Sequence, residues 1–286
     1  MKFSVWIVGA KPEDCHWRGL EDVARGIAAS LEHFTEREVL MITPDKLGDA
    51  TGSRCVIFNA HRLAPGVLPD DAIIYNAEQV RSDWEKSDVG RVYLERLRQH
   101  VVWDYSATNI ERLRGLGAKR VVHCRVGYGP GTRVIIPRPC EEDVDVLFVG
   151  STNERRAIVL FDLAAKKLKV ETLFGVYGAE RDAWISRAKV VLNIHFYAQP
   201  IFEVFRCSHL FVNSKCVVTE GGGVDPELEN LARNACAYVA YDKLVDECKR
   251  LVDDEKARIE QADRGRRVFC DISQIDEVAR ALEESK

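Results

Sequence analysis

Residues 144–156 read VDVLFVGSTNERR, and this stretch holds the pattern that decides the fold. Its first part, 144–149, is a short, Val-rich and mostly apolar run, which is typical of a strand covered on both faces in a parallel sheet. A glycine and small polar residues follow at 150–153, and a charged stretch with helical character comes next. Strand, turn and helix in this order predict one βα unit of a doubly wound α/β sheet.

The same unit recurs along the whole chain. Continuous apolar runs predict further strands at 3–8, 38–43, 54–58, 72–76, 101–105, 120–124, 170–174, 190–194, 215–219 and 237–240. Helical patterns fall at 19–33, 88–99, 107–116, 154–167, 179–188, 200–213 and 226–234. Residues 126–143 interrupt the alternation with a cluster of Pro and Gly, which indicates a connection between domains. We therefore expect two tandem Rossmann-like, doubly wound domains, 1–128 and 129–286, that face a central cleft.

The composition excludes several classes of protein. With 46% hydrophobic and 30% charged residues, the chain of 286 residues is neither disordered nor fibrous. A net charge of -4 does not indicate a basic surface for nucleic acid, although a local basic region is compatible with it. The N-terminal apolar run is too short for a membrane span or a signal peptide. Nine cysteines without a C-x-x-C pair favour reduced thiols over zinc ligands or disulfides, so we expect a soluble, cytoplasmic protein.

The turn after the strand 144–149 is the first candidate site, because ligands of open parallel sheets bind at the carboxyl ends of the strands. Gly150, Ser151 and Asn153 would expose backbone N–H groups beside a helix N-terminus, which favours an anion. Arg155 and Arg156 follow in the first helical turn and could donate pairs of hydrogen bonds to a phosphate. The alternative is an ordinary helix cap with solvated arginines. No G-x-G-x-x-G stretch is present, so a dinucleotide fingerprint is not supported.

The second candidate site follows the strand 190–194. His195 lies at the end of this strand, and the next helix is expected to begin at Pro200, which suits a first helical turn. Glu203 would then lie in that first turn, where the helix dipole favours a carboxylate that could accept hydrogen bonds from two neighbouring hydroxyls of a ribose. Glu203 and Arg206 could instead form a surface ion pair of little energetic value.

Polar residues also follow the strands of the first half. His61 comes after the strand 54–58, Glu78 after 72–76, and Asp104 and Tyr105 close 101–105. All of them would lie at the carboxyl edge of the first sheet. Two have structural alternatives, because Asp104 could cap the following helix and Glu78 could pair with Arg81.

In their order and spacing, these motifs resemble nucleotide-sugar-dependent glycosyltransferases of the two-Rossmann GT-B fold, in particular the group-1-like branch. The likeness covers most of residues 70–220. The motifs of the second half are the strand–Gly–Ser turn with two arginines, LNIH followed by FE..R, and VVTE followed by a glycine run. Those of the first half are IIYNAEQV, VWDYSATNIERLRGLG and RVGYGP, which are similar to the acceptor-side domain of that family.

The resemblance implies a hexosyltransferase whose C-terminal domain binds a nucleoside-diphosphate sugar, with UDP favoured and GDP possible as the nucleotide. Glu203 matches the glutamate that binds the ribose of the donor. His195 stands where many members carry a second glutamate that contacts the transferred sugar; it could donate to a sugar hydroxyl or a phosphate, or be a buried structural histidine. Glu220 and Gly221 match the turn that approaches the diphosphate and the sugar.

On the acceptor side, the resemblance implies a glycan or a lipid-linked sugar as substrate, with a hydroxymethylated DNA base as the alternative. Glu78, Asp104 and His195 are the catalytic candidates, while His61 and Tyr105 would line the acceptor side. The connection would act as a hinge that lines the cleft, and the last helix, 275–284, would pack back on the first domain. The residues expected in this connection are Arg125, Gly127, Tyr128, Arg133 and Arg138.

No metal cofactor is expected. Asp143 and Asp145 form a D-x-D pair like that of metal-dependent glycosyltransferases of another fold, but they precede their strand instead of following it. A fold that uses arginines and helix N-termini can balance the charge of the leaving group without a metal. Two rival functions remain open on the same scaffold: a non-catalytic protein that binds a nucleotide or sugar, and a nucleotide-sugar epimerase.

Overall fold

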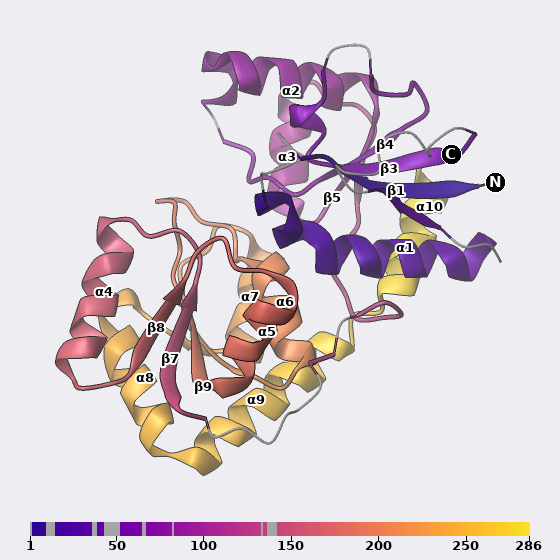
Figure 1. The fold of residues 1–286 in the computed structure, drawn as a ribbon. Coiled ribbons are helices and arrows are strands. Elements are labelled where there is room, and N and C mark those ends of the chain that lie inside the picture. Colours follow the sequence, from indigo (N-terminus) through magenta and orange to yellow (C-terminus); the bar gives the residue numbers. More distant parts are fainter. Residues whose placement is uncertain are drawn as a thin grey trace. The chain divides into compact units, whose positions relative to one another are not determined.

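The structure is a computed structural model that describes residues 2–9, 15–35, 39–42, 52–64, 67–81, 83–132, 134–135 and 142–286 (Figure 1). The chain divides into two compact units, and the first of them is discontinuous. Met1–Thr132 and Ile272–Lys286 form the first unit, and Arg133–Asp271 forms the second. No helix within the described ranges is long and apolar enough to cross a membrane.

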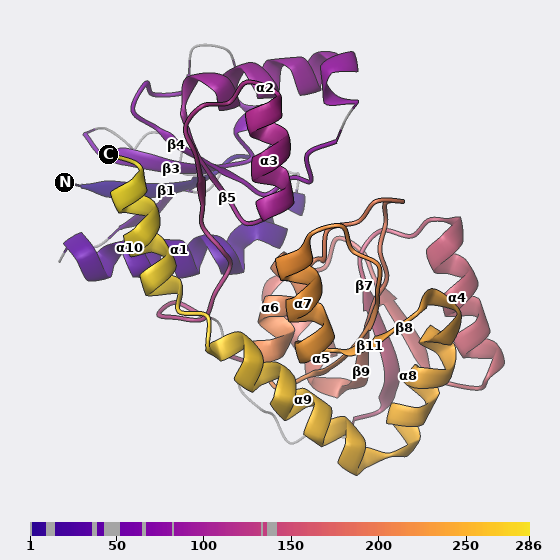
Figure 2. The same cartoon turned by 180° about the vertical axis from the view of Figure 1, so that it is seen from behind.

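The first unit is a parallel sheet with helices on both faces. The strand order is β2-β1-β3-β4-β5-β6. The helices α1 and α10 lie side by side on one face, and α2 and α3 cover the other (Figure 2). The strands are β1 (Phe3–Ile7), β2 (Leu40–Ile42), β3 (Arg54–Phe58), β4 (Ile73–Asn76), β5 (Val101–Asp104) and β6 (Val121–His123). The helices are α1 (Glu21–Thr35), α2 (Asp88–Gln99), α3 (Ala107–Gly115) and α10 (Gln274–Glu284).

The second unit repeats the plan with the strand order β11-β10-β9-β7-β8, again all parallel. Its helices α4 and α8 pack together on one face, and α5 and α6 lie on the other (Figure 1). The strands are β7 (Val144–Val149), β8 (Val170–Leu173), β9 (Ala188–Asn193), β10 (Cys216–Glu220) and β11 (Ala237–Val239). The helices are α4 (Glu154–Ala165), α5 (Gly178–Arg187), α6 (Val204–Val212), α7 (Pro226–Ala235), α8 (Leu244–Asp253) and α9 (Glu255–Cys270).

The expected α/β fold of two Rossmann-like sheets is confirmed. Side chains of the central strands, such as Val146, Phe148 and Leu192, are fully buried, as the continuous apolar runs predicted. The eight cysteines of the described ranges are free thiols. Each sheet reverses its strand order once, between β1 and β3 and between β7 and β9. Such a reversal leaves a crevice at the carboxyl ends of the two strands, which is where ligands of this architecture bind.

One expected helix begins later than predicted. The sequence placed its start at Pro200, but α6 begins at Val204. Ile201 and Phe202 are buried in a non-helical segment, and the carbonyl of Pro200 accepts a hydrogen bond from the N–H of Val224 at 2.8 Å. Burial of these apolar side chains and this contact hold the segment out of the helix. Glu203 therefore precedes the helix instead of lying in its first turn.

The C-terminal helix α10 belongs to the first unit. Its residues Val278 and Ala281 are fully buried, and the indole N–H of Trp103 on β5 donates to the hydroxyl of Ser285 at 2.9 Å. The guanidinium of Arg125 forms an ion pair with Glu277 on α10, with a closest distance of 2.6 Å. Arg125 is thus engaged within the first unit, while Arg133 and Arg138, expected beside it, lie outside the described residues.

The segment around Gly127 joins the chain leading into α10. The N–H of Gly127 donates to the side-chain oxygen of Gln274 at 2.8 Å, and Tyr128 exchanges backbone hydrogen bonds with Ile272 and Gln274 at 2.7 and 2.8 Å. A Cβ at position 127 would lie 2.6 Å from the carbonyl oxygen of Ile272. Glycine is therefore required here by the close approach of two chain segments.

We expect Gly127→Ala to lower the free energy of unfolding by about 1–3 kcal/mol, because the added methyl group must push the two segments apart. Gly115→Ala is the matched control, since a Cβ there would meet no atom within 4 Å beyond its chain neighbours and the backbone of its own helix. The measurement is urea unfolding of both variants and the wild type. Equal stability of the two variants would contradict the close packing described at Gly127.

Candidate functional site

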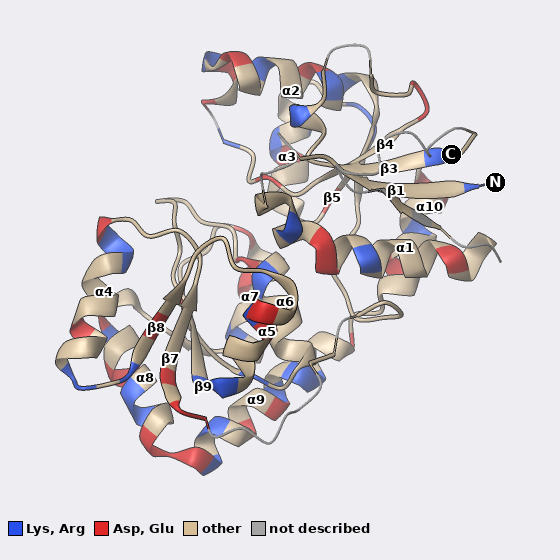
Figure 3. Ribbon diagram, viewed as in Figure 1, with Lys and Arg blue, Asp and Glu red and all other residues tan. Residues whose placement is uncertain are grey.

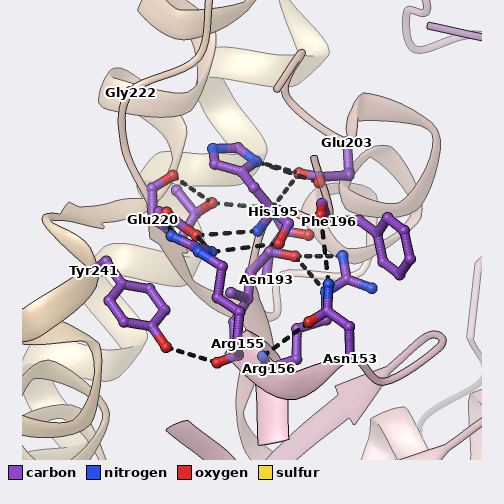
Figure 4. Close-up of polar contacts among 12 residues, drawn as sticks. Asn153, Arg155, Arg156, Asn193, His195, Phe196, Glu203, Glu220, Gly222 and Tyr241 are labelled. Carbon is purple, nitrogen blue, oxygen red and sulfur yellow. Dashed lines mark hydrogen bonds and ion pairs between the residues drawn. The ribbon is translucent and has the colours of Figure 1, made fainter. Parts of the chain in front are cut away.

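The candidate site lies at the carboxyl edge of the second sheet, where the strand order reverses. Gly150 is the first residue after β7. β9 ends at Asn193, and His195 comes two residues later; Asn193 and Ile194 are both buried. Figure 4 shows the side chains that gather here, with Glu220 from the end of β10 and Tyr241 from the segment after β11. The residues that the sequence places at strand ends of the second half are therefore brought together within this unit.

Arg156 is the buried anchor of the site. Its side chain is 2% exposed, and its guanidinium lies over the rings of Phe148 and Phe196 at 5.3 and 5.1 Å. Its N–H groups donate to the carbonyl of Ile194 at 3.0 Å and to the carbonyl of Ser151 at 2.7 Å. Burial, with the neighbouring charge of Arg206, lowers its pKa to about 10, so the group stays charged at neutral pH. The expectation that Arg156 reaches out to a phosphate is not met, because its donors are engaged with the backbone.

Arg155 is anchored but accessible. It forms a two-pronged ion pair with Glu220, one hydrogen bond of which measures 2.6 Å, and it lies 4.0 Å from the ring of Tyr241. The Tyr241 hydroxyl donates in turn to the carbonyl of Arg155 at 2.6 Å. The hydrogen bonds that Arg155 donates to Glu220 raise the pKa of its guanidinium. Its side chain keeps 38% of its surface exposed, so a charged guanidinium is held in a fixed position at the protein surface.

His195 and Glu203 form a second pair. Nδ1 of His195 lies 3.0 Å from the carboxylate of Glu203, which also accepts a hydrogen bond from the amide of Asn193 at 2.8 Å. Arg206 donates to the side-chain oxygen of Asn193 at 2.8 Å. No Glu203–Arg206 ion pair is found among the described residues, so the simple surface pair considered from the sequence is not what forms.

The second ring nitrogen of His195 has no partner. The residue is 1% exposed, and Nε2 is buried without a hydrogen bond to any described residue. In Figure 4 this nitrogen points away from Glu203. Because a carboxylate only accepts hydrogen bonds, Nδ1 must carry a proton, and in the imidazolium form Nε2 is a donor as well.

The pair favours this charged form. Burial alone would lower the pKa of His195, but the hydrogen bond and charge of Glu203, with Glu220 and Glu229, raise it above the ordinary value of 6.5. Burial would raise the pKa of Glu203, but His195 and Arg206 lower it to about 2. The ion pair between the His195 imidazolium and the Glu203 carboxylate therefore persists into the neutral pH range.

The turn at 150–153 offers backbone donors. The side chain of Asn153 caps α4 by accepting from the N–H of Arg156 at 3.0 Å, as the structural alternative predicted. Within the part of the chain that the structure describes, the N–H groups of Ser151 and Thr152 have no acceptor. Gly150 adopts a φ of +148°, which allows the chain to turn sharply out of β7.

The glycine run after β10 is already engaged. The N–H groups of Gly222 and Gly223 donate to the carboxylate of Glu229 on α7 at 2.9 and 3.0 Å. Gly222 has a φ of +103°, and a Cβ at Gly221 would collide with the ring of Tyr238. Glu229 therefore holds this turn. The resemblance implies that the turn at Gly221 approaches a diphosphate, but the N–H groups of Gly222 and Gly223 are already used and are not open to such a ligand.

The polar residues of the first unit have different surroundings. Asp104 is fully buried and accepts hydrogen bonds from the side chain of Asn76 at 2.6 Å, the N–H of Ser106 at 2.9 Å and the side chain of Asn109 at 3.2 Å. This network gives Asp104 a structural role, but the cap of α3 is Ser106, whose hydroxyl accepts from the N–H of Asn109 at 3.1 Å, and not Asp104 as the alternative had it. Tyr105 is buried as well.

His61 is partly buried, and Glu78 is exposed. Burial, with Arg62 and Arg96, lowers the pKa of His61 to about 4, so its ring is neutral at neutral pH. Glu78 is exposed at the residue level, yet the surrounding protein raises the pKa of its carboxyl group against the opposing effect of Arg62 and Arg81.

The D-x-D pair lies at the other end of β7. Asp143 forms ion pairs with Lys169 and Arg187 at 2.9 and 2.7 Å, and Asp145 forms one with Lys189 at 2.7 Å. In the ranges that the structure describes, no group of three or more His, Cys, Asp or Glu side chains is arranged to hold a metal ion.

The sequence reasoning missed several members of the site. Asn193, Glu229, Tyr238 and Tyr241 were not singled out, although Asn193 and Tyr241 lie at or just after strand ends. The strand-end rule that found His195 and Glu220 could have found these two. Glu229 and Tyr238 carry no such signal, because one lies on a helix and the other within a strand.

No protein-family model matches the chain. Among curated proteins, it is 28% identical over 179 residues to the uncharacterised protein L140 of Acanthamoeba polyphaga mimivirus, a match that covers 61% of this chain and 57% of L140. It is 30% identical over 106 residues to the uncharacterised protein L138 of the same virus, covering 36% of this chain and 12% of L138. The chain thus spans just over half of the first relative and a small part of the second.

Solved structures match over the whole chain. Anabaena HepE in complex with UDP and glucose has a TM-score of 0.63 and 12% identity, covering 99% of this chain and 98% of HepE. AviGT4, a glycosyltransferase involved in avilamycin A biosynthesis, has a TM-score of 0.62 and 14% identity, covering 100% and 97%. A mutant of T4 phage BGT in complex with UDP-glucose has a TM-score of 0.55 and 12% identity, also covering 100% and 97%. These matches confirm the expected GT-B-like fold.

The pair of His195 and Glu203 should make stability depend on pH. The pKa of His195 is higher in the folded protein than its ordinary value of 6.5. The charged imidazolium therefore contributes fully to the free energy of unfolding below pH 6.5, and this contribution is lost as the pH rises through the folded pKa. We expect Glu203→Gln to lower the free energy of unfolding by about 3 kcal/mol near about pH 6, where His195 is charged, and by less at higher pH, where His195 loses its charge. Urea unfolding from about pH 6 to pH 9 measures this.

Asp253→Asn is the control, because Asp253 pairs with Lys249 on α8, where both side chains are about half exposed. Its effect should stay below about 1 kcal/mol at every pH. If Glu203→Gln showed the same small loss at every pH as this control, the buried ion pair would not exist.

Proposed function

We propose that the protein is a glycosyltransferase that moves a hexose from a nucleoside-diphosphate sugar, UDP-sugar in the first place, to a hydroxyl of an acceptor. The observation that carries this proposal is a set of hydrogen-bond donors beside the reversal of strand order in the second unit. Each of these donors either has no acceptor among the described residues or remains open to solvent. They are the N–H groups of Ser151 and Thr152, the exposed guanidinium of Arg155 and Nε2 of His195. The likeness in fold to HepE and BGT, which were solved with UDP or UDP-glucose, supports the same conclusion.

The second unit would hold the donor. The turn amides and the N-terminus of α4 favour a diphosphate, and Arg155 adds a charged fork held in place by Glu220. Glu203 would accept hydrogen bonds from the ribose hydroxyls with the part of its carboxylate not used by His195 and Asn193. Arg156 supports this arrangement from the interior and does not itself contact the donor.

His195 would act where negative charge develops. As the bond between the sugar and the diphosphate breaks, charge accumulates on the leaving phosphate oxygen. A positioned donor stabilises that charge more in the transition state than in the ground state. The imidazolium of His195, oriented through Nδ1 by Glu203, would donate from Nε2 to this phosphate or to a sugar hydroxyl. Together with Arg155 it supplies the positive charge, and for that reason we propose that no divalent ion is required.

The first unit would bind the acceptor, a glycan or a lipid-linked sugar, with a hydroxymethylated DNA base as the alternative. Glu78 is the preferred base, because it is exposed at the end of β4 and its raised pKa brings it closer to the pH at which it must take a proton. His61, which follows the neighbouring strand β3, would contribute a neutral ring to the same edge of the sheet. Asp104 is not part of this proposal, since its carboxylate is buried in the network with Asn76.

The donor site is tested by Arg155→Gln. We expect this variant to bind UDP-glucose at least tenfold more weakly, because a charge-assisted contact is worth about 1.5–3 kcal/mol. Arg187→Gln is the matched control: it removes the same charge from the same unit at the opposite end of β7, where Arg187 pairs with Asp143. Isothermal titration measures both. If the two variants bind UDP-glucose equally well, the donor site is not where we place it.

Transfer itself is tested by Glu78→Gln. With candidate acceptor glycans, the wild type should release UDP and form a glycosylated product, whereas the variant should bind UDP-glucose normally but lose at least 100-fold of the transfer rate, since a general base contributes about 10²–10⁴-fold. Asp83→Asn is the control, an exposed acid of the same unit that pairs with Arg81. Binding without UDP release would instead identify a non-catalytic binding protein, and a changed sugar on an intact nucleotide would identify an epimerase. A salt-sensitive gel shift on hydroxymethylated DNA tests the alternative acceptor.

A further inference from the structure

A hollow in the second unit gathers arginines and lies apart from the candidate donor site. Its volume is about 760 Å³, within the range of pockets that hold small ligands. It is formed along β11 by α7, α8 and α9, and β11 is the edge strand of the sheet, whereas the donor site lies at the reversal between β7 and β9. Figure 3 marks basic positions along α8 and α9. Six charged residues line it: Arg233, Glu247, Arg250, Glu260, Arg264 and Arg267.

The two acids of this arginine hollow are already paired with bases. Glu247 accepts two hydrogen bonds from Arg250, at 2.8 and 2.7 Å. Glu260 lies 4.0 Å from Lys256 one turn earlier on α9. Neither carboxylate is paired with Arg264 or Arg267, so the charge of these two arginines is not balanced within the hollow.

Arg264 and Arg267 lack an acidic partner among the described residues. Arg264 donates to the carbonyl of Cys236 at 3.1 Å, and the Arg267 side chain has no hydrogen bond or ion pair with any residue that the structure describes. The two residues are three apart on α9, so they lie on the same face, separated by about 4.5 Å along the helix axis. Like charges at this spacing repel one another, and an anion between them would remove that repulsion.

A third guanidinium reaches the hollow from α7. Arg233 donates to the hydroxyl of Tyr238 at 3.1 Å and lies 4.3 Å from its ring, and Glu229 lies 3.7 Å away. Arg233 therefore lines the same hollow, and Glu229 balances only part of its charge. Three arginines from two helices thus converge on a pocket that is open, polar and lined by few apolar side chains.

From this geometry we propose that the arginine hollow is a binding site for a small ligand with two or more phosphate or carboxylate groups. Planar guanidinium groups donate two parallel hydrogen bonds to each such group, which lysines cannot do. One anionic group would lie between Arg264 and Arg267, and a second would face Arg233. The site is separate from the donor site and does not depend on the proposed transferase activity.

Titration with sodium tripolyphosphate tests the proposal, on the full chain in physiological salt, with every variant made both in the wild type and in the Arg155→Gln background. Arg155→Gln weakens the proposed donor site, so tripolyphosphate binding that is the same in both backgrounds reports the arginine hollow whether or not the donor proposal holds. The test variant is R264Q/R267Q. The matched control is K166Q/K167Q, which removes two exposed positive charges at the end of α4 in the same unit.

We expect saturable binding of tripolyphosphate to the wild type and to K166Q/K167Q, and at least tenfold weaker binding to R264Q/R267Q. R264K/R267K, which keeps the charge but not the forked donors, should fall in between, and it serves as a second test if the Gln variant does not fold. A parallel titration with citrate tells phosphate from carboxylate. Equal affinity in R264Q/R267Q and K166Q/K167Q, or no saturable binding at millimolar concentrations, would overturn the proposal.

Discussion

The guanidinium of Arg156 is the contact on which the candidate site depends. It is buried, and it links the turn after β7 to the end of β9 through the carbonyls of Ser151 and Ile194. These two strand ends border the reversal of strand order, and they carry the open amides and His195. Burying a charged group is costly unless its donors are satisfied, so an arginine used in this way fixes its neighbours closely. Arg155, one residue earlier, can face solvent because Arg156 holds the helix start in place.

The fold could be predicted largely from the sequence. Strands buried on both faces appear as uninterrupted apolar runs, and helices carry their own period, so 144–149 and 88–99 coincide with β7 and α2 as the structure has them. The strand-end rule also located His195 and Glu220 correctly at the edge of the second sheet. The start of α6 could not be predicted in the same way, because Pro200 is as suitable for a first helical turn as for the extended segment it occupies. Tertiary burial of Ile201 and Phe202 decided between the two.

Side-chain partners were beyond the sequence. Nothing in the order of residues says that Glu220 holds Arg155, that Glu229 occupies the amides of the glycine run, or that Asn76 and Asn109 enclose Asp104. These contacts join residues between 5 and 65 positions apart, and they depend on which strands become neighbours. Sequence reasoning therefore identified which positions meet at the sheet edge, but not which of them face inward. For Arg155 and Arg156, which are adjacent and chemically identical, the structure alone separates the exposed from the buried member.

The discontinuity of the first unit bears on how the protein is made. Its sheet is synthesised first, yet α10, which covers Trp103 and pairs with Arg125, follows the whole second unit in the chain. The second unit is contained in one uninterrupted stretch, so it can complete its structure while the earlier one still lacks a helix. Domains generally fold as they emerge from the ribosome. Here the order of completion is reversed relative to the order of translation, and the apolar surface beneath α10 stays uncovered until α10 itself has been synthesised.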